Sequence, residues 1–83
     1  MKMTIDQYNL IIEIMRKAEA AADADHRRKE SHYSDLYERC LKKGMKSEEI
    51  SEGLKEQQDE CTKALNKLNA IEAILLKLEN TEI

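Results

Sequence analysis

Only one segment of this 83-residue chain, Lys42-Lys43-Gly44, carries strong signals for ending a helix. Two cations there suit the negative end of a helix dipole, and the glycine can adopt the left-handed conformation that closes a helix. The chain contains no proline, and its other glycine, Gly53, stands alone within a helical pattern, at a cost of about 1 kcal/mol relative to alanine. A chain with a single strong break is expected to form two long helices joined by one turn.

Start signals precede both expected helices. Thr4 and Gln7 have the spacing of a capping box, in which each residue binds the backbone amide of the other. Ser47 is placed to cap the second helix. The expected elements are a helix over about 5–43, a turn at about 44–46 and a helix over about 48–80, in one domain of residues 1–83.

The composition agrees with helices and argues against sheets. The chain has no valine, proline, tryptophan or phenylalanine, and only two glycines, whereas strands and their turns need these residue types. Alanine, leucine, isoleucine, glutamate, lysine and glutamine dominate. The expected fold class is therefore all-α, with two long antiparallel helices in a helical hairpin or coiled coil.

A heptad repeat predicts the seam, meaning the face that each helix turns toward the other. The second helix has nine seam positions, and all of them except Gln57 are apolar. They are Ile50, Leu54, Gln57, Cys61, Ala64, Leu68, Ile71, Leu75 and Leu78. The seam of the first helix is apolar at both ends, but between Arg16 and His32 the only apolar side chains of this helix are alanines. Its positions are Ile5, Tyr8, Ile12, Met15, Glu19, Ala22, His26, Lys29, Tyr33, Leu36 and Cys40.

An antiparallel hairpin about this turn pairs residues whose numbers sum to about 90. In that register Arg16 can reach Glu72, and Asp25 can reach Lys67. Exposed pairs of this kind contribute only about 0.2–1 kcal/mol each, so they help to select the register more than they add stability. The alternative is a break near Asp23–His26, where an aspartate could cap a new helix and give three helices.

Large apolar side chains outside the seam predict an interaction surface at the end of the hairpin that carries the two termini. A chain this short also buries little core of its own. We therefore expect a homodimer that completes a four-helix bundle, or contact with another protein. The predicted interface residues are Leu10, Ile14, Ile74 and Leu76, with a second, weaker patch near the turn that includes Tyr37 and Leu41.

Charge is divided unevenly along the chain, whose net charge is −3. Residues 1–46 hold ten Lys and Arg against eight Asp and Glu, whereas residues 47–83 hold four against nine. Carboxylates along the second helix could imitate a phosphate backbone and occupy a basic channel of a partner protein. This possible acidic face comprises Glu48, Glu49, Glu52, Glu56, Asp59 and Glu60.

A single basic run follows His26 and comprises Arg27, Arg28 and Lys29. It could contact phosphates, which makes a nucleic-acid-binding module the alternative function. Acidic neighbours surround the run, however, and no aromatic side chains interleave with it. The negative net charge also gives no steering toward nucleic acid.

No catalytic signature is present. Cys61 near His26 would act as a nucleophile only if its thiol pKa were lowered. Glu19, Asp23 and His26 share one helical face, and Asp23-x-x-His26 is a distant variant of the Glu-x-x-His motif of di-iron bundles, although the second helix has no histidine. We expect no enzymatic activity and no cofactor, with a metal-binding bundle as a third hypothesis.

Two cysteines without a secretory signal predict free thiols in a reducing cytoplasm. No apolar run approaches the roughly 18 residues of a membrane span. The sequence therefore predicts a cytoplasmic, non-enzymatic helical protein that binds protein. A phage or mobile-element accessory protein that inhibits a host protein or complex is one form of this expectation, because small charged helical chains are frequent in that class.

Overall fold

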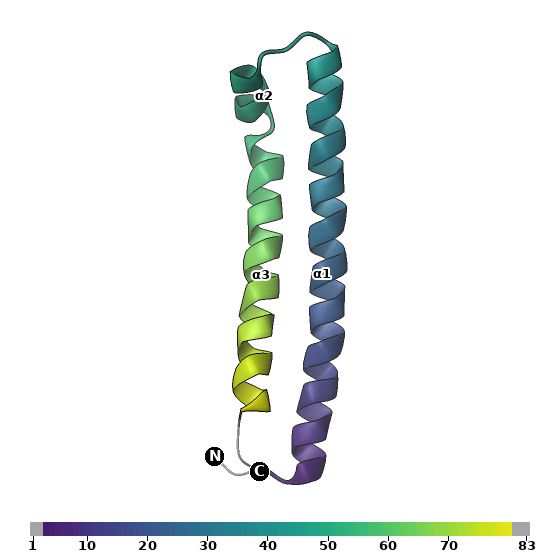
Figure 1. Cartoon of the computed structure of the whole chain (residues 1–83), viewed down its shortest axis with the longest axis vertical. Helices are drawn as coiled ribbons and strands as arrows, with labels where there is room; N and C mark the ends of the chain where they lie inside the picture. The colour runs from purple at the N-terminus through teal and green to yellow at the C-terminus, as the bar shows by residue number, and fades with distance from the viewer. Residues whose placement is uncertain (1–2, 81–83) are drawn as a thin grey trace.

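The computed structural model describes residues 3–80, which form an antiparallel helical hairpin (Figure 1). α1 spans Ile5–Lys42, α2 spans Ser47–Gly53 and α3 spans Lys55–Glu79. α1 runs the length of a rod of 60 × 16 × 15 Å, and α2 and α3 return beside it. The all-α helical hairpin is thus confirmed, and the ends of the predicted domain, 1–2 and 81–83, lie outside the described residues.

The predicted capping box begins α1. The Thr4 hydroxyl accepts a hydrogen bond from the Gln7 amide at 3.1 Å, and the Gln7 side-chain oxygen accepts one from the Thr4 amide at 3.1 Å. Asp6 lies in the first turn, at the positive end of the helix dipole. These contacts satisfy backbone amides that the helix itself leaves unpaired.

α1 is continuous through Asp23–His26, so the alternative with three helices divided at that point is wrong. The aspartates that could have capped a new helix instead bind cations one turn farther along. Arg27 lies 3.1 Å from Asp23, and Lys29 lies 3.1 Å from Asp25. Pairs with this i,i+4 spacing stabilise a continuing helix.

Gly44 ends the first helix as predicted. Its φ of +84° is the one positive value among the described residues. The Gly44 amide donates to the Leu41 carbonyl at 3.0 Å, and the Met45 amide donates to the Cys40 carbonyl at 3.2 Å. A left-handed glycine lets the chain turn back while these last carbonyls keep their hydrogen bonds.

Ser47 does not cap the second helix, contrary to the prediction. Lys46 occupies the capping position without a side-chain hydrogen bond, and Ser47 is the first residue of α2. The Ser47 hydroxyl lies 3.0 Å from the Tyr37 hydroxyl. It therefore ties the turn to α1 instead of satisfying an amide of its own helix.

The second predicted helix is divided at Leu54, where φ is −106° and ψ is 17°. Hydrogen bonds continue across the break, from the Leu54 amide to the Ile50 carbonyl and from the Gln58 amide to the Leu54 carbonyl, both at 2.9 Å. Gly53 directly precedes the break. Ile50 and Leu54 are both buried, so the bend keeps the apolar face of α2 in the core.

Burial confirms the predicted seam. From Ser47 to Glu79, the buried or half-buried residues are the nine predicted positions and no others. In α1, every predicted position except Ile5 is at least half-buried. Ile5 belongs to the first turn of α1, which extends past the end of α3 (Figure 1), so α3 does not cover it.

The predicted ion pairs between the helices are replaced by others. Arg16 lies 2.9 Å from Glu79 and not beside Glu72. Asp25 pairs with cations of its own helix and not with Lys67. The seam therefore sets the register without the charge pairs that the sequence suggested.

Candidate protein-binding surfaces

The hairpin has two flanks beside the seam, and an ion pair marks each. A residue that directly follows a seam position lies on one flank of its helix, and one that directly precedes a seam position lies on the other. Arg16 and Glu79 both follow seam positions, so their 2.9 Å pair defines the Arg16 side. Glu60 precedes one, so its 3.7 Å pair with Lys29 defines the Lys29 side.

Two of the predicted interface residues are exposed on the Lys29 side. The exposed fraction is 56% for Ile14 and 47% for Ile74, and each directly precedes a seam position. Other aliphatic side chains that precede seam positions extend this surface on both helices. The whole set, called the isoleucine face below, is Ile11, Ile14, Ala18, Ala21, Ala70 and Ile74.

The remaining predicted interface residues at the terminal end point elsewhere. Leu76 follows a seam position and is 61% exposed on the Arg16 side, together with the partly exposed Leu65. Leu10 is exposed on the outer surface of α1. The apolar surface that the sequence predicts as one region is therefore divided between different faces of the hairpin.

The weaker patch near the turn has an internal role. The Tyr33 and Tyr37 rings lie 6.2 Å apart between centroids, at an interplanar angle of 38°. Tyr37 is half-buried and its hydroxyl contacts Ser47, whereas Leu41 is exposed. Tyr37 thus helps to hold the turn, a contact that the sequence did not indicate.

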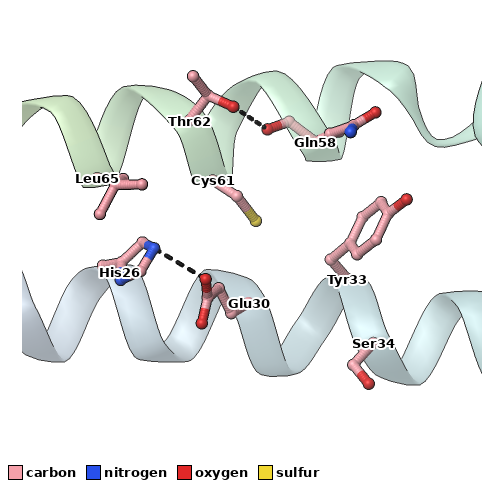
Figure 2. Close-up of a pocket in the computed structure, with 8 residues that line it drawn as sticks. All are labelled: His26, Glu30, Tyr33, Ser34, Gln58, Cys61, Thr62 and Leu65. Carbon is pink, nitrogen blue, oxygen red and sulfur yellow. Dashed lines mark hydrogen bonds and ion pairs between the residues drawn. The ribbon is translucent and has the colours of Figure 1, made fainter.

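An open groove of about 430 Å³ lies on the Arg16 side, and the sequence did not predict it. Figure 2 shows α1 residues on one wall and α3 residues on the other, with the Cys61 sulfur between them. The small side chains of Ser34, Cys61 and Thr62 are among those that line the groove. The lining residues are His26, Glu30, Tyr33, Ser34, Gln58, Cys61, Thr62 and Leu65.

The groove does not activate the Cys61 thiol. Burial and the nearby Glu30 carboxylate raise the pKa of Cys61 above its ordinary value. The His26 Nε2 atom lies 3.0 Å from the Glu30 carboxylate, as Figure 2 shows. A nucleophilic cysteine needs the opposite shift, so these residues do not form the Cys–His arrangement considered from the sequence.

Each cation of the basic run forms an ion pair with a carboxylate of its own helix. Arg27 pairs with Asp23 at 3.1 Å. Arg28 and Lys29 both pair with Asp25, at 2.8 and 3.1 Å. Hydrogen bonds from Arg28 and then Lys29 hold the pKa of Asp25 below its ordinary value. A phosphate would have to compete with these carboxylates for the same cations.

The predicted acidic face is exposed along α2 and the first turns of α3. Its residues are Glu48, Glu49, Glu52, Glu56, Asp59 and Glu60. Glu60 pairs with Lys29 and Lys63, each at 3.7 Å. The other five have no ion pair within residues 3–80, so their charges face solvent.

The residues considered for a metal site are engaged separately. Asp23 pairs with Arg27, and His26 pairs with Glu30, while Glu19 is half-buried at a seam position. Within the described part of the chain, no group of three or more His, Cys, Asp or Glu side chains is arranged to hold a metal ion.

Together these features define an all-α helical hairpin with apolar side chains exposed on several faces. None of its described helices has the combination of length and apolar character that crossing a membrane requires. Comparison with protein-family models, curated proteins and solved structures finds no match to the chain. The surfaces of the hairpin are therefore the guide to its function.

Proposed function

We propose that this chain is a non-enzymatic helical hairpin that acts by binding protein. The observation that carries the proposal is the exposure of large aliphatic side chains outside the core. Among residues 3–80, seven are exposed: Ile5, Leu10, Ile14, Leu41, Leu65, Ile74 and Leu76. Within the same range, four large aliphatic side chains are buried: Ile50, Leu54, Leu68 and Leu75. A surface of this kind is typical of proteins that bury part of it against a partner.

The total accessible surface supports the same proposal. The chain exposes 6593 Å². A compact monomer of the same mass, 9.6 kDa, would expose about 5,100 Å². A two-helix rod with so small a core is marginally stable alone, and covering its apolar surface would add to the driving force for folding.

The two rival functions have less support. The cations of the basic run already have carboxylate partners, and the net charge of −3 opposes approach to nucleic acid. A metal-binding bundle lacks a suitable donor group in residues 3–80. A cytoplasmic location and an inhibitory role as a phage accessory protein stay predictions, because they depend on composition alone.

A capture experiment tests the proposal. The full chain is immobilised and exposed both to a soluble copy of itself and to an extract of its native host. In one variant Leu10, Ile14 and Leu76 are replaced by glutamine, and in a matched control the exposed Asn9, Glu13 and Asn69 are replaced by glutamine. The first variant is expected to lose at least about tenfold in captured protein, while the control retains it.

Two results would contradict the proposal. One is the absence of any bound protein, whether self or foreign, from a chain that circular dichroism shows to be helical. The other is salt-sensitive binding to duplex DNA or RNA that disappears when Arg27 and Arg28 are replaced by glutamine. The second result would place nucleic-acid binding first.

A further inference from the structure

We infer that the isoleucine face is covered by a second copy of this chain, in a symmetric four-helix bundle in which α1 of each hairpin packs on α3 of the other. This inference depends on the proposed function, because it names the partner that one of the apolar faces takes.

The composition of the isoleucine face suits packing against a second copy. Ile14 on α1 and Ile74 on α3 are both exposed. They lie at similar heights along the rod, because their residue numbers sum to 88, close to the sum of 89 for Lys29 and Glu60, which contact each other across the helices. The same flank holds alanines at positions 18, 21 and 70, and Lys67 and Lys77 border its apolar part on α3. Alanines allow another helix to approach closely, and the isoleucines supply the area to be buried. A face with matching apolar surface on both helices can pack against itself across a two-fold axis.

The length of the rod favours an arrangement with the turns at the same end. α1 contains 38 residues, which span about 57 Å. Copies with the turns at the same end lie side by side along this whole length, whereas copies that ran in opposite directions and overlapped only at their terminal halves would share about half of it. A standard stable interface buries about 800 Å² of accessible surface on each partner, which favours the longer overlap.

Charge near the turn also suits this arrangement. Arg39 directly precedes a seam position of α1 and Glu49 directly precedes one of α2, so both lie on the Lys29 side, and their numbers sum to 88. Within residues 3–80 neither has an ion pair. Asp35 also lies on this flank, at the height of Glu56, so Arg39 and Glu49 are the complementary pair. When α1 of one copy packs beside the returning helices of the other, Arg39 of each copy lies near Glu49 of the other.

The arrangement is tested by sedimentation equilibrium of the full chain. The wild-type mass is expected to be twice the 9.6 kDa of the chain. Ile14→Lys is expected to raise the dimer dissociation constant by at least about tenfold, because a lysine would be placed in the apolar interface. Asn69→Lys is the matched control, since Asn69 is exposed on the opposite flank, and it is expected to leave the constant nearly unchanged. Ile74→Lys repeats the test from α3, in case Ile14→Lys impairs folding as measured by circular dichroism.

A spin label tests the orientation of the two copies. With Cys40 and Cys61 replaced by alanine, a label at Lys43→Cys is expected to give an intermolecular distance well below the 60 Å length of one hairpin. A distance beyond that length would overturn the orientation. A dimer weakened by Leu76→Lys but not by Ile14→Lys or Ile74→Lys would overturn the choice of face.

A helical wild-type chain that remains monomeric at about 100 μM, where a dissociation constant of even 10 μM would give mostly dimer, overturns the whole inference. The proposed function would still be decided separately, by whether the immobilised chain captures a foreign protein.

Discussion

The two helices that meet along the seam fill it with different chemistry. In the middle of α3 the seam positions are aliphatic, and Ala64 and Leu68 are buried. Opposite them, α1 contributes one buried alanine, Ala22, and the half-buried polar side chains of His26 and Lys29. The Lys29 ammonium pairs with carboxylates at the edge of the seam, which leaves its methylenes to cover apolar surface.

This difference indicates where stability originates. Burial of an aliphatic side chain contributes about 1.5–3 kcal/mol, whereas an exposed ion pair contributes about 0–1 kcal/mol. The leucines of α3 should therefore provide most of the stability in the middle of the hairpin. The polar residues of α1 should mainly keep water away from those leucines with their side-chain stems.

The largest expected effect comes from shortening a leucine of α3. Leu68→Ala should lower the free energy of unfolding by about 2–4 kcal/mol, because it removes buried methyl groups and leaves a cavity. Lys29→Met should have a much smaller effect, because it keeps the stem and removes an ammonium that lies at the surface. Urea unfolding followed by circular dichroism measures both. Equal losses in the two variants would show that the charges of α1 matter as much as the leucines.

The same difference explains how much of the fold could be predicted. The seam of α3 was predictable to the residue, because an aliphatic heptad repeat has one favourable way to be buried. The capping box at Thr4 and the left-handed Gly44 were predictable because each signal is local. The break at Leu54 and the contact of Ser47 with Tyr37 were not, because both depend on how the returning helix meets α1.

The candidate surfaces were less predictable than the fold. The exposed residues Leu10, Ile14, Ile74 and Leu76 were named from their positions outside the seam, but their division between flanks requires the direction of each helix relative to the other. The groove beside Cys61 depends on the relative sizes of side chains across the seam. Sequence periodicity contains no information about that complementarity.

A smaller effect is expected at the one polar seam position of the returning helices. The Gln57 side-chain oxygen is buried and has no hydrogen-bond partner among the described residues. Gln57→Leu should raise the free energy of unfolding by about 1 kcal/mol, because it removes an unsatisfied acceptor and adds an aliphatic side chain to the seam.

Asn66→Leu is the matched control, since Asn66 is exposed on the outer surface of α3 and a leucine there would gain little. The comparison is made by thermal and urea unfolding of the two variants beside the wild type. A gain at Asn66 equal to that at Gln57 would mean that helix propensity or association, and not seam packing, produces the effect.

The smallest expected effect concerns Asp25, on the polar stretch of α1. Hydrogen bonds from Arg28 and Lys29 hold its folded-state pKa below the ordinary value of about 3.9 that it has in the unfolded chain. The unfolded chain therefore binds the proton more readily, so the contribution of Asp25 to stability is present above about pH 4 and is lost as the pH falls through the folded-state pKa.

The difference in unfolding free energy between wild type and Asp25→Asn should stay constant from pH 7 to 5 and shrink below pH 4. Asp59→Asn, at an exposed carboxylate without an ion pair within residues 3–80, is the matched control for replacing a carboxylate by an amide. An identical acid dependence in all three proteins would mean that the pairs of Asp25 add no stability, and that the polar stretch of α1 acts through its side-chain stems alone.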